Sequence, residues 1–180
     1  QGELQLAEGT RVQGNNDLLN LTRPDIISDI HRRYLEAGAD IVTANTFNSQ
    51  RISQAEYHCG HLVRQLNAEA VRLARQQAKT FSTADKPRYV IATMGPTGKS
   101  LSISPDVNDP AYRSISYDEL RDAYTEQATA LLESGVDAIL VETVFDTLNA
   151  KAALDAAVSA MHTTDITVPL MLSITVNDRY

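Results

Sequence analysis

The chain has 180 residues and a formal net charge of −7, with 43% hydrophobic and 22% charged residues. These values are ordinary for a globular protein with one sizeable core, and the acidic balance argues against nucleic-acid or anionic-membrane binding, since both need a basic face. No apolar run approaches the roughly 20 residues of a membrane span. A single cysteine, Cys59, excludes an internal disulfide framework and favours a reducing cytoplasm.

Predicted strands and helices alternate along the chain. The first 22 residues contain no convincing strand, and helical spacing of apolar residues then predicts a helix over 24–37, with Thr22 as its N-cap and Gly38 as its stop. Strand followed by helix, repeated, predicts parallel pairing with helices on the outside. The predicted strands lie at 40–45, 88–94, 138–141 and 168–174. The other predicted helices lie at 49–79 (broken near Gly60), 117–134 and 147–161.

An internal repeat relates two of these strands. "EAGADIVTANTF" at 36–47 and "ESGVDAILVETVF" at 133–145 share a glutamate, a glycine and an aspartate at the same spacing, which places Asn45 opposite Glu142. Ligands of parallel α/β folds bind beyond the carboxyl ends of the strands. We therefore interpret Glu142 as a carboxylate that points into the mouth of a pocket.

The alternative interpretation is that Glu142 only caps the next helix, whose first turn favours carboxylates. Asp146 stands in a better capping position, directly before Thr147.

Four strands, with a helix after each of the first three, make about half of an eight-unit barrel of typically about 250 residues. We interpret the chain as an internal piece of a longer α/β protein, or as the ordered part of one.

Two short motifs suggest other functions. "GPTGKS" at 95–100 ends like a P-loop, but that pattern needs its first glycine where Thr93 stands, and no helix follows to cradle a phosphate. "HCGH" at 58–61 offers His58 and His61 on one helical face, while Cys59 would point elsewhere. We expect neither a nucleotide site nor a zinc site here, and we interpret "HCGH" as a half-exposed surface patch.

We interpret isolated histidines and the arginines of one helix as structural or surface residues, not as parts of a site. His31 and His162 stand alone on predicted helices and are expected to be surface or helix-end residues. Arg64, Arg72 and Arg75 are spaced along one predicted helix and are expected to form a solvated face.

Long ungapped stretches carry a resemblance to a known family. "GNNDLLNLTRPDIISDIHRRYLEAGADIVTANTFNS" (14–49), "GPTGKSLSISPDVNDPAYRSISYDEL" (95–120) and "VETVFDTLNAKAAL" (141–154) resemble the N-terminal homocysteine-binding domain of cobalamin-dependent methionine synthase. The resemblance implies a (β/α)8 TIM barrel. It also implies a zinc ion, held by three cysteines, that activates the homocysteine thiol as a thiolate. In that family the thiolate takes a methyl group from methylcobalamin, which methyltetrahydrofolate recharges.

The departures from the family limit what this chain can do alone. The family's zinc cysteines lie in later strands, in an Asn-Cys pair and a Gly-Gly-Cys-Cys run, and Cys59 is not one of them. The glycine-rich turn after the family's first strand is also missing. The chain, residues 1–180, is therefore expected to be a partial barrel domain with about strands 2 to 5. Zinc and cobalamin are implied as cofactors with ligands outside this chain, which has no expected catalytic or metal-binding residue and is expected to be inactive alone.

One wall of the substrate pocket is expected to remain. Glu142 aligns with the family's acidic residue that accepts hydrogen bonds from the substrate ammonium group, and such charge-assisted bonds are strong. For the other expected pocket residues, a role in shaping the loops is an equal alternative to direct contact. These residues are Asn45, Thr46, Phe47, Gly95, Pro96, Thr97 and Ser173.

Three functional classes stay open. The first is the homocysteine module of methionine synthase, whose partners are homocysteine and the folate- and cobalamin-binding modules of the same protein. The second is a related zinc-dependent homocysteine methyltransferase that uses a small-molecule methyl donor. The third is a barrel that binds an amino acid without methyl transfer.

Overall fold

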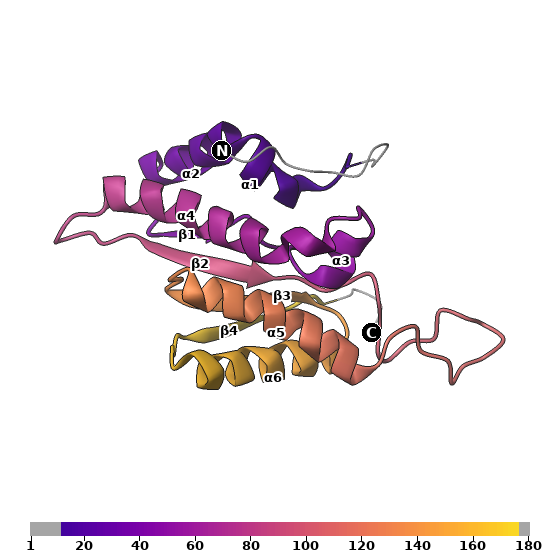
Figure 1. Cartoon of the computed structure of the whole chain (residues 1–180). Helices are drawn as coiled ribbons and strands as arrows, with labels where there is room; N and C mark the ends of the chain where they lie inside the picture. Colours follow the sequence, from indigo (N-terminus) through magenta and orange to yellow (C-terminus); the bar gives the residue numbers. More distant parts are fainter. Residues whose placement is uncertain (1–11, 177–180) are drawn as a thin grey trace.

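The computed structural model describes residues 12–176 (Figure 1). Helices and strands alternate through most of this range, as predicted. None of the helices within 12–176 is long and apolar enough to cross a membrane. The elements are η1 (Asn16–Leu18), α1 (Leu19–Thr22), α2 (Pro24–Glu36), β1 (Ile41–Ala44), α3 (Arg51–Ala55), η2 (Gly60–Leu62), α4 (Val63–Phe81), β2 (Tyr89–Met94), α5 (Tyr117–Glu133), β3 (Ala138–Val144), α6 (Thr147–Thr164) and β4 (Leu170–Ile174).

The strands form one parallel sheet in the order β1-β2-β3-β4. Helices α2, α4, α5 and α6 pack against one another in chain order, and α4, α5 and α6 also contact the sheet (Figure 1). Because helices cover one face of the sheet, side chains of β1 alternate between buried and exposed positions. Val42 and Ala44 are buried toward the helices, and Ile41 and Thr43 are exposed on the other face. The predicted α/β fold is confirmed, and the sheet is consistent with part of a TIM barrel.

Small side chains allow the helices to approach closely. Helix α6 packs against α5 and β3, and its alanines are buried at nearly zero exposure, among them Ala152, Ala156 and Ala160. Helix α5 begins with a capping box, in which Ser116 accepts from the backbone N–H of Glu119 and the Glu119 carboxylate accepts from the backbone N–H of Ser116. The capping box thus places the start of α5 at Tyr117, and the first buried apolar residue of the helix, Leu120, follows directly after Glu119.

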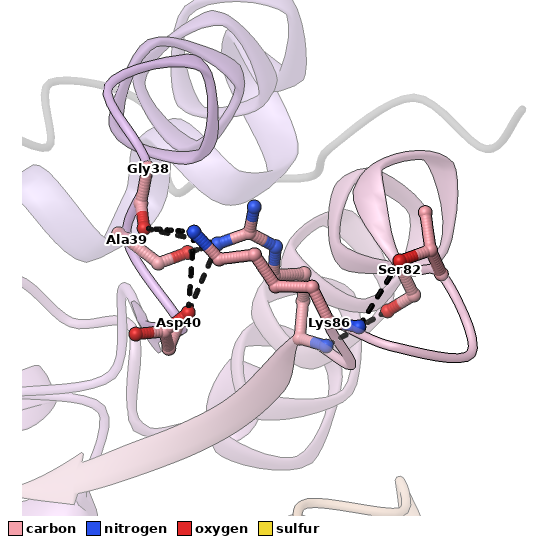
Figure 2. Close-up of polar contacts among 7 residues, drawn as sticks. Gly38, Ala39, Asp40, Ser82 and Lys86 are labelled. Atoms are coloured by element: carbon pink, nitrogen blue, oxygen red, sulfur yellow. Dashed lines mark hydrogen bonds and ion pairs between the residues drawn. The ribbon is translucent and has the colours of Figure 1, made fainter.

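The turn before β1 is held by two basic residues (Figure 2). Gly38 has φ +101°, a left-handed conformation that favours glycine. Arg88, whose side chain is largely buried, donates to the carbonyls of Gly38 (3.0 Å) and Ala39 and contacts Asp40. Lys86 donates to the same Gly38 carbonyl at 3.3 Å. These cations satisfy carbonyls of the turn that follows α2, close to the helix C-terminus, where the helix dipole favours positive charge.

The repeat-related turn before β3 has the same construction. Gly135 has φ +80°, and Arg75 donates to its carbonyl and, at 2.7 Å, to the Asp137 carboxylate. The prediction of a purely solvated face is therefore wrong for Arg75, which ties α4 to this turn. Arg64 and Arg72 are exposed and form surface ion pairs, as predicted.

Two sequence predictions near α2 are wrong. Thr22 is the last residue of α1, and its hydroxyl donates to the Leu18 carbonyl at 3.1 Å, so the N-cap position of α2 falls to Arg23. His31 is not a surface or helix-end residue, because only 5% of it is exposed. It lies mid-helix on the apolar face of α2, together with Ile27 and Leu35.

Candidate functional site

The carboxyl ends of β1 and β3 open into one cavity of about 520 Å³. Glu142 lines it from β3, and Thr93 of β2 lies between the two strand ends. The predicted residues Asn45, Thr46 and Phe47 line it from the end of β1. The apolar face of α2 closes one side, through Ile27, Ile30, His31 and Tyr34.

Glu142 has a position unlike that of an ordinary strand residue. It lies within β3, which continues to Val144, rather than at the strand end, and the pairing with β4 shifts register between Val141 and Val144. Thr143, inside this irregularity, has φ +59°, which is strained for a β-branched residue. Bulges of this kind re-aim side chains and are common beside active sites.

The Glu142 carboxylate is half-buried and has no hydrogen-bond or ion-pair partner among residues 12–176. A half-buried carboxylate is an acceptor for a cationic donor, and an ionised pair forms stronger hydrogen bonds than a neutral one. The geometry therefore offers this group to a ligand in the cavity.

Asp146, and not Glu142, caps the next helix, as predicted. Its Oδ1 accepts from the backbone N–H groups of Leu148 (2.9 Å) and Asn149 (3.3 Å). Its carboxylate also accepts from the hydroxyls of Ser100 (2.6 Å) and Ser102 (2.7 Å). Burial alone would raise the pKa of Asp146, but these hydrogen bonds outweigh it and lower the pKa to about 2.

The polar groups at the end of β1 are engaged within the protein. Thr46 is fully buried, and its hydroxyl donates to the Thr93 carbonyl (2.8 Å) and accepts from the Thr93 N–H (3.0 Å). The side-chain amide of Asn45 donates to the Asn16 carbonyl (2.9 Å) and to Asn20 Oδ1 (3.2 Å). Both residues line the cavity, but these donors hold the fold together.

Gly95 allows the segment after β2 to approach Phe47, in the loop after β1, closely. Its N–H donates to the Phe47 carbonyl at 3.0 Å, and a Cβ at this position would lie 2.7 Å from that oxygen and 2.8 Å from the Phe47 ring. The buried Tyr124 hydroxyl donates to the Gly95 carbonyl at 3.0 Å. The glycine is required by the packing of Phe47, while Gly95 and Pro96 also border a small void beside Glu142.

Two predicted pocket residues lie away from the cavity. The Thr97 hydroxyl is buried and bonds to the backbone of Lys99, so it shapes the loop after β2. Ser173 lies on β4 with an exposed side chain and is not among the residues that line the cavity. The structure thus brings Asn45, Thr46 and Phe47 together with Glu142 in the cavity, and Gly95 and Pro96 border only the smaller void.

Sequence reasoning missed the contribution of α2. His31 and Tyr34 line the cavity, and the His31 Nε2 atom is buried without a partner among the described residues. Burial lowers the pKa of His31 and favours the neutral imidazole. The apolar spacing Ile27, Ile30, His31 and Tyr34 was the available signal, since these positions share one helix face.

The described residues do not form the zinc site that the family resemblance implies. Within 12–176, no three His, Cys, Asp or Glu side chains cluster closely enough to hold a metal ion. The prediction of a half-exposed surface patch is confirmed for His58 and His61, which are exposed, and is wrong for Cys59, which is fully buried. The Cys59 Sγ lies 3.2 Å from the Tyr57 carbonyl. Burial raises the pKa of the Cys59 thiol and disfavours the thiolate. We assign no reaction step to a metal on these residues.

A parallel sheet with outer helices is the architecture of part of a TIM barrel, and barrels of this kind bind small molecules beyond the carboxyl ends of their strands, where Glu142 lies. The chain belongs to the homocysteine S-methyltransferase family, whose family model matches residues 2–180.

Solved structures of a bacterial homocysteine methyltransferase show the same fold. The chain is similar to the homocysteine methyltransferase MmuM from Escherichia coli. In its metallated form the identity is 18% and the TM-score 0.69, with 89% of this chain and 55% of that chain covered. In the oxidised form the identity is 20% and the TM-score 0.71, with 89% and 54% covered. The chain spans about half the length of these structures.

Proposed function

We propose that this chain is the homocysteine-binding part of a cobalamin-dependent methionine synthase. In the complete protein, a methyl group would pass from methylcobalamin to the homocysteine thiolate and give methionine. Family membership supports homocysteine as the substrate. The observation that carries the proposal within this chain is Glu142, an unpartnered carboxylate among the described residues that faces a cavity at the carboxyl end of the sheet.

The proposed task of this chain is to hold the amino-acid end of homocysteine. The Glu142 carboxylate accepts hydrogen bonds from the substrate ammonium group, and the half-buried setting strengthens their electrostatic attraction. Phe47 and the apolar face of α2 border the same cavity and limit access of water. Fixing one end of the substrate reduces the freedom of its thiol, which favours reaction with a methyl donor held elsewhere.

The cofactors and the other modules belong to the proposal. Zinc would activate the substrate thiol, and cobalamin would carry the methyl group. In this proposal the residues that hold both groups lie outside residues 12–176. The folate- and cobalamin-binding modules are the proposed partners within the same protein, in a cytoplasmic setting. Residues 1–180 would then be one partial barrel domain that completes its fold with further strands.

The second candidate is a homocysteine methyltransferase with a small-molecule methyl donor. Its support is the structural similarity to a homocysteine methyltransferase from Escherichia coli. The sequence identity to that protein is low, so the similarity is one of fold. Both candidates use Glu142 in the same way, because they share the substrate and differ in the donor. The stretches at 14–49, 95–120 and 141–154 resemble the cobalamin-dependent family and favour the first.

A comparison of methyl donors tests the proposal. The complete protein that contains this chain is incubated with homocysteine and with methylcobalamin or methyltetrahydrofolate, and methionine is measured. Parallel reactions contain a betaine or a methylsulfonium compound as the only donor. We expect methionine only with the cobalamin and folate donors. Methionine formed only from a small-molecule donor would establish the second candidate, and a protein that binds homocysteine without any transfer would establish a binding module.

A further inference from the structure

The loop that follows β1 is fastened at every backbone carbonyl from residue 45 to residue 49. Such complete pairing is unusual in a connecting segment, because loops commonly leave carbonyls to water. The donors come from several parts of the chain, and of these only Gln54 lies in the helix, α3, that directly follows the loop. Asn20 donates to Asn45 (2.8 Å), Gln127 to Thr46 (2.8 Å), the Gly95 N–H to Phe47 (3.0 Å), Gln54 to Asn48 (3.1 Å) and Asn67 to Ser49 (2.7 Å).

Asp17 supplies the matching acceptor for this loop. The residue is 3% exposed, and its Oδ1 accepts from the Asn48 N–H (3.1 Å) and from the Ser49 hydroxyl (2.7 Å). Asn20, in the following helical turn, is fully buried and also accepts from the Asn45 side chain. Residues 15–20 therefore contact the loop through both donors and acceptors.

Asn15 extends the same arrangement through Gln54. The two side-chain amides donate to each other, Asn15 Nδ2 to Gln54 Oε1 at 2.8 Å and Gln54 Nε2 to Asn15 Oδ1 at 3.3 Å. Gln54 Nε2 also donates to the Asn48 carbonyl. Asn15 thus orients the amide that holds the loop.

These polar groups are buried at a cost, because each loses its hydrogen bonds to water. An apolar contact would hold a loop in place with less desolvation, but it would not fix each peptide plane. A fully paired polar network specifies one conformation. The loop that it fixes carries Asn45, Thr46 and Phe47, which line the cavity of Glu142.

We propose that residues 15–20 are a positioning element of the ligand pocket, in which Asp17 and Asn20 hold the loop after β1 in its binding conformation. The inference rests on the proposed function in one respect, the identity of homocysteine as the ligand. Asp17 and Asn20 do not line the cavity, so they act through Asn45, Thr46 and Phe47.

Two substitutions of Asp17 separate positioning from charge. Both of its described bonds use Oδ1, so Asp17→Asn keeps the acceptor, whereas Asp17→Leu has a similar volume and keeps none. In the complete protein we expect Asp17→Leu to weaken homocysteine binding about tenfold with kcat nearly unchanged, because a displaced wall lowers affinity more than it alters the reacting thiol. Asp17→Asn should restore affinity to within about twofold.

Amide hydrogen exchange supplies a readout that does not depend on the substrate. In Asp17→Leu, exchange in a peptide covering 45–50 should accelerate at least tenfold, while β3 exchanges as in the wild type. If Asp17→Leu fails to fold, Ser49→Ala removes one bond only and should move exchange and affinity in the same direction by about threefold.

The outcomes distinguish the two proposals. A wild-type protein that binds no homocysteine would overturn the proposed function, and the exchange experiment would then decide the positioning role. Folded Asp17→Leu and Ser49→Ala proteins with wild-type exchange in 45–50 would overturn the positioning role. Loss of affinity in Asp17→Asn equal to that in Asp17→Leu would also overturn it, since charge and not loop geometry would then be responsible.

Discussion

The ends of β1 and β3 occupy equivalent places in the internal repeat but differ in what their side chains do. At β1, Thr46 is fully buried and bonded to Thr93, and the Asn45 amide is bonded to the N-terminal segment. At β3, Thr143 is exposed with a positive φ, and Glu142 has no partner among the described residues. One strand end is scaffold, and the other is available to a ligand.

The difference shows how one unit of a βα repeat can leave a carboxylate without bonds inside the described part of the chain. Both units keep the glycine and the aspartate of the turn before the strand, each fastened by an arginine. After β3 the carboxylate that makes structural bonds is Asp146, which accepts from Ser100 and Ser102 in the loop after β2 and caps α6. Glu142 is thereby free of a structural task.

The largest effect is expected at Asp146. Asp146→Ala leaves the buried N–H groups of Leu101 and Asn149 and the two serine hydroxyls without this acceptor, and we expect a loss of about 3 kcal/mol in the free energy of unfolding at pH 7. Chemical denaturation of the complete protein measures it. Asp155→Ala on the outer face of α6 is the control and should change stability by less than about 0.5 kcal/mol. Equal losses in the two variants would contradict the assignment.

Asp146 also predicts a dependence on pH. Its folded-state pKa of about 2 lies below the ordinary 3.8, so its contribution is present above pH 3.8 and is lost as pH falls toward 2. The shift corresponds to roughly 2 kcal/mol. Wild-type stability should therefore fall over this window by about that much more than the stability of Asp146→Ala. Parallel pH profiles for the two proteins would refute the assignment.

A smaller effect is expected at Thr46. Thr46→Val keeps the shape of the side chain but removes the hydroxyl that donates to the Thr93 carbonyl, so about 1 to 2 kcal/mol of stability should be lost. Thr43→Val, on the face of β1 that lines the cavity, is the matched control for stability and should be nearly neutral in that respect. If the β1 end binds ligand directly, Thr46→Val will lower homocysteine affinity without a loss of stability, which contradicts the scaffold role.

The smallest change in stability is expected at Thr143. Its positive φ is strained for a threonine, so Thr143→Gly should gain up to about 1 kcal/mol, offset in part by the flexibility of glycine. Homocysteine affinity should fall, because the strained backbone aims the neighbouring Glu142. Asp165→Gly, also at positive φ but at the far end of α6, should gain stability without a change in affinity. A fall in stability in Thr143→Gly would show that the conformation is unstrained.

Much of the fold could be predicted because its signals are local. The turn glycines Gly38 and Gly135, the cap at Asp146 and the periodicity of the strands each depend on residues a few positions apart. The errors arose where distant contacts decide. Thr22 belongs to a short helix that packs on α4, and the burial of His31 depends on the assembled cavity beside β1.

The candidate site was predictable only in part. The internal repeat located Glu142 and the end of β1, but it could not show that Asn45 and Thr46 bond to residues far away in the chain. The positive φ of Thr143 carries no sequence signal, since threonine rarely adopts it. Tertiary contacts, and not residue type, separate the scaffold residues from the carboxylate that lacks a partner among the described residues.

The affinity of Glu142→Gln for homocysteine tests the central claim most directly. The substitution keeps the shape and removes the charge, so binding to the complete protein should weaken by about 1.5 to 3 kcal/mol, or roughly 10- to 150-fold. Metal content should stay at the wild-type level, and Glu133→Gln, at an exposed surface ion pair on α5, should bind homocysteine normally. Unchanged affinity in Glu142→Gln, or loss of metal from it, would contradict the assignment of Glu142 to the substrate ammonium group.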